Sequence, residues 1–129
     1  MLGLGHDVVD VPAFAKQLNE PGTRMRNLFS MREIWQTAQR SQLKHDDEAV
    51  HLAARWAGKE AFLKAAGTGL REPFSLCEIE AVRLPGGAPA YHFSGRSAQW
   101  MEAHRLRAHL SLSHEDGMAM AYCILETET

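Results

Sequence analysis

The segment from Asp46 to Gly69 constrains the fold more than any other part of the chain, because it combines alanines and charges at helical spacing. The acidic residues at 46–48 suit the positive end of a helix dipole, and Gly67 suits a C-terminal stop. Small apolar residues recur at three- and four-residue steps, at Val50, Ala54, Ala57, Ala61 and Ala65. We therefore predict one long helix with a stripe of small side chains that another backbone approaches closely.

Another side of this predicted helix is crowded with charge. Glu60 and Lys64 stand four residues apart, as do Arg55 and Lys59, so we expect one carboxylate among three cations. A solvent-exposed helix surface with weak salt bridges is the ordinary explanation of such a pattern. A functional explanation requires partner residues from elsewhere in the chain. For Lys59, the sequence leaves open whether it belongs to a site or to the surface.

The N-terminal segment over residues 2–9 is predicted to be a buried strand. Gly3 and Gly5 in this strand allow another backbone to come close. Asp7 interrupts the apolar run, and a buried carboxylate is costly unless it is paired, caps a helix or holds a metal. Asp10 is the better helix cap, because a proline follows it by two residues.

Helices dominate the first half of the remaining chain and strands dominate the second half. Helices are predicted over 12–19 and from Ser30 to about Arg40, with Ser30 and Glu33 forming a capping box. Strands are predicted over 76–84, 88–93, 109–113 and 118–125, with a short helix over 94–104 and a hairpin turn at 115–117. This order predicts an α+β fold with a mostly antiparallel sheet.

Length and composition narrow the class of protein. The 129 residues are enough for one domain with its own core, which we expect to span residues 1–129. A net charge of −2 gives no support for nucleic-acid binding, and no apolar run has the length of a membrane span. The N-terminus lacks the basic start of a signal peptide. Cys77 and Cys123 have neither metal-ligand spacing nor disulfide density, so we predict reduced core cysteines and a cytoplasmic protein.

Three separate features require a common explanation: Asp7 at a strand end, Glu60 with Lys64 on the helix, and the segment 111–114 entering the hairpin. Together they supply two carboxylates, an ammonium group, hydroxyls and the imidazole of His114. Magnesium is typically held by one or two carboxylates, with phosphate oxygens and water completing its shell. The set therefore suits a substrate that carries a diphosphate, although a histidine such as His114 is by itself more often structural.

These residues, in this order, resemble the bacterial holo-(acyl-carrier-protein) synthase family of 4′-phosphopantetheinyl transferases. The resemblance covers nearly the whole chain, and the helix block that ends in Gly-Thr-Gly is its most specific part. It implies the transferase fold, with a long helix packed on a mostly antiparallel sheet, and a homotrimer with sites between subunits. The matching blocks are Gly3-Leu-Gly-His-Asp-Val-Val-Asp10, Arg55-Trp-Ala-Gly-Lys-Glu-Ala-Phe-Leu-Lys-Ala-Ala-Gly-Thr-Gly69, and Ser111-Leu-Ser-His-Glu115 followed by Ala119-Met-Ala121.

The resemblance implies transfer of 4′-phosphopantetheine from coenzyme A to a serine of apo-acyl carrier protein, which releases adenosine 3′,5′-bisphosphate. Asp7 and Glu60 would hold Mg²⁺, and Lys64 and His114 would join them as catalytic residues. A water on the metal, Glu60 and His114 all stay open as acceptors of the serine proton. The residues that the resemblance places along coenzyme A are Arg55, Lys64, Gly87, Pro89, Ser113 and His114.

The chain departs from the family pattern at two places. The family often has a basic residue early in the first helix, where 12–14 is apolar here, and a lysine where Ala88 stands. The first departure bears on carrier docking and the second on the nucleotide end of coenzyme A. As a hypothesis, docking falls instead to Arg24, Arg26 and Arg32.

Three alternatives to this function stay open at the level of sequence. In the first, the acceptor is a carrier domain of a large type I fatty acid synthase instead of a free carrier protein. In the second, the chain is a non-catalytic module that binds coenzyme A. In the third, it is a Mg²⁺-dependent phosphohydrolase. The intact pair of acids argues against a module that only binds.

Overall fold

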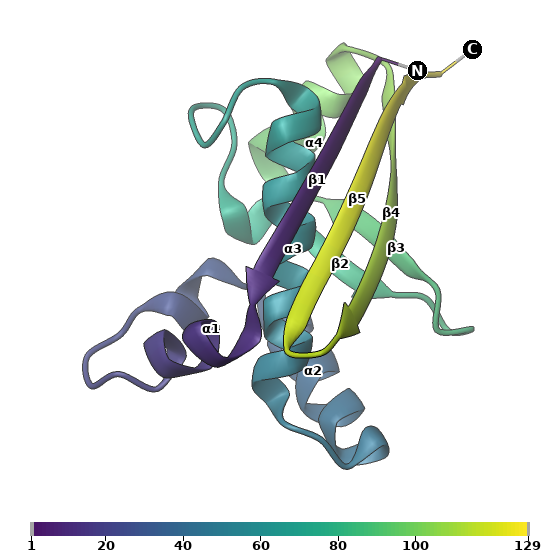
Figure 1. Cartoon of the computed structure of the whole chain (residues 1–129). Coiled ribbons are helices and arrows are strands. Elements are labelled where there is room, and N and C mark those ends of the chain that lie inside the picture. The colour runs from purple at the N-terminus through teal and green to yellow at the C-terminus, as the bar shows by residue number, and fades with distance from the viewer. Residues whose placement is uncertain (1, 129) are drawn as a thin grey trace.

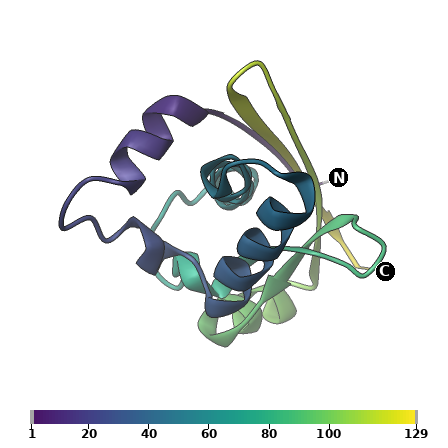
Figure 2. The same ribbon diagram turned by 90° about the horizontal axis from the view of Figure 1, so that it is seen from below.

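A single long helix is the centre of the molecule, as the computed structural model of residues 2–128 shows (Figures 1 and 2). Helix α3 (Glu48–Ala66) is seen end-on in Figure 2, with the other elements arranged around it. The three-stranded antiparallel sheet has the order β1-β5-β4, and β2 and β3 form a separate antiparallel pair. The strands are β1 (Gly3–Asp10), β2 (Ile79–Arg83), β3 (Pro89–Phe93), β4 (Leu106–Glu115) and β5 (Met118–Thr127), and the other helices are α1 (Val11–Leu18), α2 (Met31–Lys44) and α4 (Gly95–Ala103).

The predicted α+β fold is confirmed, and three elements have a boundary that differs from the prediction by three residues or more. Helix α2 continues past Arg40 to Lys44, because good helix formers follow and His45 ends the helix in a left-handed conformation (φ 55°). The strand predicted from 76 starts only at Ile79, after a 3₁₀ turn over 76–78. Strand β4 is longer than expected at both ends. No helix within residues 2–128 is both long and apolar enough to cross a bilayer.

The helix ends form as predicted from local sequence. Asp10 accepts a hydrogen bond from the backbone N–H of Ala13, so it is the cap of α1. The Ser30–Glu33 capping box of α2 is complete. Gly67 ends α3 with φ at 76°, a conformation that glycine adopts without strain. These local signals fix where α3 begins and ends, and hence which of its residues reach the site.

Strand β1 lies directly on the small-residue stripe of α3. Ala57 and Ala61 are fully buried there. A Cβ atom on Gly5 would lie 1.8 Å from the carbonyl oxygen of Ala61, and one on Gly3 would lie 2.1 Å from that of Ala65. The predicted close approach is therefore confirmed, and it brings Asp7 of the strand to the helix.

We expect Gly5→Ala to destabilise the protein severely, because its methyl group meets helix backbone rather than a movable side chain. Overpacking of this kind costs about 1–3 kcal/mol or more. Gly86→Ala is the matched control, because a Cβ there meets nothing within 4 Å and the backbone is not left-handed. Urea unfolding measures both variants. Equal stability of Gly5→Ala and Gly86→Ala would contradict the packing described.

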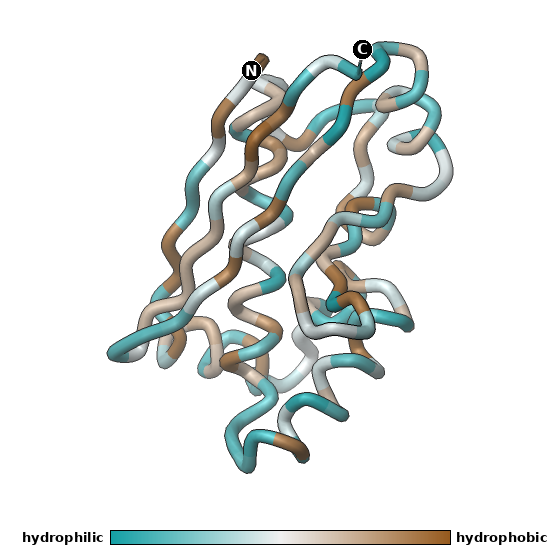
Figure 3. Tube along the Cα trace, turned by 90° about the vertical axis from the view of Figure 1, so that its right-hand side faces the viewer, coloured by the Kyte–Doolittle hydropathy of each residue, from teal (hydrophilic) through white to brown (hydrophobic). Residues whose placement is uncertain are grey.

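The prediction that β1 is buried is wrong for one of its faces. Gly5, Asp7 and the other odd-numbered residues face α3, whereas the even-numbered ones point away from it. The outward face of the sheet carries a row of exposed apolar side chains, and Figure 3 shows hydrophobic segments along the three long strands. Those between 39% and 63% exposed on β1 and β5 or just before them are Leu2, Leu4, Val8, Tyr122 and Ile124. Cys77 is also exposed rather than in the core, whereas Cys123 is buried, and both are free thiols.

Candidate active site

Asp7, Glu60 and Lys64 come together where β1 crosses α3, as the sequence predicted. Lys64 Nζ lies 2.8 Å from Asp7 Oδ1 and 3.0 Å from the carbonyl oxygen of His6. Both carboxylates line one open pocket of about 320 Å³, between β1, α1 and α3. Trp56 lines the same pocket one helical turn before Glu60. The pocket thus offers two acids and one movable cation to a ligand.

The two acids repel each other, which is one reason why the pKa of Glu60 is raised. Partial burial raises the pKa of Glu60, the negative charge of Asp7 raises it further, and Lys64 offsets part of the effect. Two carboxylates held this close gain stability from a cation between them. In the structure Lys64 supplies that charge from one side only.

The expectation of three cations around Glu60 is wrong for two of them. Lys59 Nζ is fully buried and donates to Glu33 Oε1 at 2.6 Å, and to the carbonyl oxygens of Leu76 and Ile79 at 2.7 Å each. The ammonium group therefore has three acceptors for its three protons, all of them structural. Lys59 connects α3 to α2 and to the start of β2, and it does not reach the pocket.

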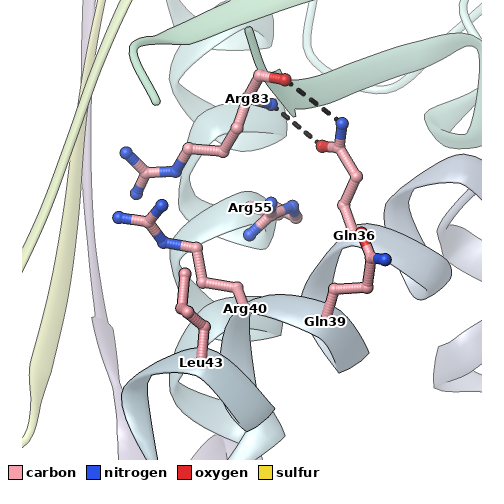
Figure 4. A pocket seen from close by; sticks show the side chains of 6 residues that line it. All are labelled: Gln36, Gln39, Arg40, Leu43, Arg55 and Arg83. Carbon is pink, nitrogen blue, oxygen red and sulfur yellow. Dashed lines mark hydrogen bonds between the residues drawn. The ribbon is translucent and has the colours of Figure 1, made fainter. Parts of the chain in front are cut away.

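Arg55 also points away from Glu60, into a second pocket of about 170 Å³ (Figure 4). Its side chain is fully buried, and Nη1 donates to the carbonyl oxygen of His51 at 3.3 Å. Among residues 2–128, its Nε and Nη2 atoms have no hydrogen-bond partner. Burial, together with the nearby positive charge of Arg83, lowers the pKa of Arg55 to about 10, so the group still carries its charge near neutrality.

Three guanidinium groups from three elements meet at this second pocket (Figure 4), which we call the arginine pocket. Arg40 comes from α2, Arg55 from α3 and Arg83 from the end of β2, and Gln36, Gln39 and Leu43 complete the lining. The Nε atom of Arg83 is buried and has no hydrogen-bond partner in the described part of the chain, like two of the nitrogens of Arg55. Like charges held together with unsatisfied donors are costly unless an anion binds among them. The arrangement suits a phosphate group.

The turn that the sequence placed near the nucleotide adjoins this pocket. Arg83 Nη1 donates to the carbonyl oxygen of Gly87 at 3.0 Å, and Arg83 pairs with Pro89 in the β2–β3 ladder. Gly87 and Pro89 therefore lie next to Arg83, which lines the pocket together with Arg55. Arg40 and Arg83 were not singled out for the site, because only their convergence on Arg55 distinguishes them from ordinary surface arginines.

Ser113 and His114 lie on opposite faces of β4, because successive residues of a strand alternate. The ladder aligns Asp7, Ala121 and Leu112 across the three strands, on the face that packs on α3. His114 shares the parity of Leu112 and contacts His51 of α3 edge-on, with 6.1 Å between ring centroids. Ser113 points outward, so it cannot meet Asp7 of the same chain.

Most of the predicted residues thus form two groups rather than one, and the outward-facing Ser113 belongs to neither. Asp7, Glu60 and Lys64 share one pocket. Arg55, Gly87 and Pro89 gather around the arginine pocket on another side of α3, and His51 lies between Arg55 and His114. Arg55 and Glu60 are five residues apart, which places them about 140° apart around the helix axis. One chain therefore holds the acids and the arginines in separate pockets.

The residues of the acid pocket fit a magnesium ion. Asp7 and Glu60 provide hard oxygen ligands, their mutual repulsion is relieved by a cation, and the pocket is open to further ligands. Within residues 2–128 no cluster of three or more His, Cys, Asp or Glu side chains is arranged to hold a metal. Two carboxylates are nevertheless sufficient for an ion whose shell is completed by substrate phosphates and water.

The three arginines proposed for docking are unequally available. Arg26 Nη1 pairs with Glu48 Oε1 at 2.5 Å, and Arg32 lies 3.8 Å from Glu80. Both arginine side chains are about half exposed, although Glu80 is buried, so each arginine can exchange its partner at little cost. Arg24 is exposed.

Comparison with known proteins shows the family of this chain. A family model described as the 4′-phosphopantetheinyl transferase superfamily matches residues 3–123. A holo-[acyl-carrier-protein] synthase of Bifidobacterium animalis subsp. lactis is 44% identical, over 98% of each chain. The chain belongs to the holo-(acyl-carrier-protein) synthase family. A second member, from Trichlorobacter lovleyi, is 41% identical over 98% of each chain.

Solved structures of holo-(acyl-carrier-protein) synthases have the same fold. The enzyme from Neisseria meningitidis superposes with a TM-score of 0.87 at 26% identity, over 98% of this chain and 99% of that one. The "Chronobacterium ammoniagenes ACPS-CoA complex" superposes with a TM-score of 0.79 at 31% identity, over 98% of both chains. The resemblance found in the three sequence blocks is therefore confirmed, and with it the fold.

Proposed function

We propose that this synthase transfers 4′-phosphopantetheine from coenzyme A to a serine of apo-acyl carrier protein, giving the holo-protein and adenosine 3′,5′-bisphosphate. The observation that carries the proposal is the pocket in which Asp7, Glu60 and Lys64 meet, within a chain of this family. The unsatisfied arginine pocket supports a substrate that carries several phosphates.

Asp7 and Glu60 would hold Mg²⁺, which when bound supplies Lewis-acid polarisation of the diphosphate oxygens. The side chains provide the rest. Lys64 has Asp7 and a carbonyl oxygen as its partners, and its exposed ammonium group can turn to a phosphate oxygen instead. Phosphoryl-type transfer depends mainly on positioning and charge stabilisation, so no protein nucleophile is required. A bound water, Glu60 and His114 remain the candidates for the serine proton.

We propose further that one complete site needs two copies of the chain, in a homotrimer. Coenzyme A carries a diphosphate and a separate 3′-phosphate, and the chain presents acids and arginines on different sides of α3. A ring in which the acid pocket of one copy faces the arginine pocket of the next would join the two half-sites. The exposed apolar row on β1 and β5, with outward Ser113 on the same face of the sheet, supports contact between copies there.

Mixed trimers test this arrangement. Glu60→Gln chains lack the acid pair and Arg83→Met chains lack an arginine, so we expect each trimer to be inactive alone or nearly so. When the two are refolded together, about a quarter of the sites combine an intact acid pocket with an intact arginine pocket in a ring of three. We expect transfer activity to return to about that fraction.

The control is a mixture of Glu60→Gln with Asp7→Asn chains, in which every site keeps a defective acid pocket and activity stays absent. Activity that does not return in the Glu60→Gln and Arg83→Met mixture, despite proven subunit exchange, would contradict a site shared between copies.

The function itself is tested by incubation with coenzyme A, Mg²⁺ and apo-acyl carrier protein, followed by mass spectrometry. We expect the carrier to gain the mass of phosphopantetheine. Free phosphopantetheine with an unmodified carrier would indicate a hydrolase, and no reaction would indicate a binding module. Using a carrier domain of a type I fatty acid synthase as a second acceptor compares the two kinds of partner. Docking through Arg24, Arg26 and Arg32, a single domain over 1–129 and a cytoplasmic location stay predictions.

A further inference from the structure

His51 is a buried histidine on α3 that the proposed mechanism does not use. Its side chain is 4% exposed, and its Nε2 atom lies 2.7 Å from Oδ1 of Asp46, which precedes the helix. Burial lowers the pKa of His51, although the neighbouring Asp46 opposes this. A neutral ring with Nε2–H donated to the carboxylate satisfies both, and it fixes the orientation of the imidazole.

His51 touches two residues that the proposed function places along coenzyme A. Its ring meets the exposed His114 edge-on, at 6.1 Å between centroids. Its carbonyl oxygen accepts a hydrogen bond from Arg55 Nη1 at 3.3 Å, and the other two nitrogens of that guanidinium have no hydrogen-bond partner within residues 2–128. The charged or titratable groups that face His51 are Asp46, Arg55 and His114.

We infer that His51 is a positioning residue for the coenzyme A phosphates: Asp46 fixes its ring, and that ring holds the imidazole of His114 ready for a phosphate. The inference rests on the proposed function. An exposed histidine loses rotamer freedom when it binds a ligand, which costs free energy. Contact with a fixed neighbour restricts the side chain before the ligand binds, so the cost of binding is smaller. His51 and Asp46 thus act through His114, and neither touches the reacting atoms.

The test compares His51→Ala with His51→Gln, whose amide can still donate to Asp46, and with Asp46→Ala. Histidine His104, stacked on Trp100 in α4, provides the control variant His104→Ala. Calorimetry measures binding of adenosine 3′,5′-bisphosphate, and kinetics separate the KM for coenzyme A from the KM for the carrier. We expect His51→Ala to weaken bisphosphate binding and raise the KM for coenzyme A about tenfold or more, the KM for the carrier to stay unchanged, and His51→Gln to lie between.

A folded His51→Ala protein that binds the bisphosphate as tightly as wild type would overturn the inference. If His51→Ala does not fold, Asp46→Ala decides, because its side chain is partly exposed and its loss leaves the core intact. Wild-type protein that neither binds nor transfers would overturn the proposed function instead. In that case the NMR signals of the His114 ring test the inference. We expect them to shift in His51→Gln and not in His104→Ala, and any other result would contradict the inference.

Discussion

Removal of either acid of the metal pair is expected to abolish transfer while leaving the protein folded. Glu60→Gln and Asp7→Asn keep the shape of each side chain and remove its charge. A Lewis acid at the diphosphate is worth several kcal/mol of barrier, and each 1.4 kcal/mol is a factor of ten. We therefore expect kcat/KM to fall about a thousandfold or more in either variant, measured by mass gain of the carrier.

Although Glu60→Gln is expected to lose activity, we do not expect it to lose folding stability. Because the pKa of Glu60 is raised in the folded protein, this group stabilises the fold below its ordinary value of 4.5, and that contribution is lost as the pH rises through the raised value. Near neutrality the ionised Glu60 is therefore unfavourable in the absence of a cation. We expect Glu60→Gln to be at least as stable as wild type in urea at neutral pH.

Magnesium supplies the control for this pair. Mg²⁺ should raise the unfolding midpoint of the wild-type protein, since it binds only the folded state, and it should do so much less in Glu60→Gln. Transfer that persists in either single variant, at a rate near that of wild type, would refute the assignment of Asp7 and Glu60 as the metal ligands.

The largest loss of stability is expected from Lys59→Met. This substitution leaves Glu33 buried without its positively charged partner, and it removes the ammonium group that donates to the carbonyl oxygens of Leu76 and Ile79. Removing one partner of a buried ion pair costs about 3–5 kcal/mol. That is a large share of the roughly 5–15 kcal/mol that stabilises an ordinary domain. Urea unfolding should therefore show a strongly reduced midpoint.

Lys44→Met is the matched control, because Lys44 is exposed in the last turn of α2. We expect that change to cost under about 1 kcal/mol, from loss of a favourable charge at the helix end. If Lys59→Met were as stable as Lys44→Met, the three hydrogen bonds of Lys59 would not contribute to the fold as described.

Local signals in the chain were sufficient for most of the secondary structure. Asp10, the Ser30–Glu33 box and Gly67 fix helix ends through hydrogen bonds that reach only a few residues along the chain. Helical spacing also set Glu60 one turn from Lys64. The pairing of Asp7 with Glu60 came instead from the resemblance of the three sequence blocks to a known family. The strand-over-helix contact needed only the glycines of β1 and the alanines of α3.

Long-range contacts decided what the charges on α3 do. Lys59 and Glu60 are neighbours in sequence, yet Lys59 is buried against Glu33, 26 residues earlier, while Glu60 lines the acid pocket. Sequence periodicity places both residues on a helix, but it does not show which distant residues contact each side of that helix. The arginine pocket is the same case, because Arg40, Arg55 and Arg83 belong to three elements that only packing brings together.

The sequence by itself determined the long helix, the close approach of β1, the α+β order of elements and, through its three blocks, the family. These features depend on local propensity and residue spacing, which involve residues that are close together in the sequence. Only the tertiary structure decided that Asp7 and Glu60 line one pocket, while Arg55 meets Arg40 and Arg83 at another. The reason is physical: the direction of a side chain becomes a contact only when a distant element occupies the space in front of it.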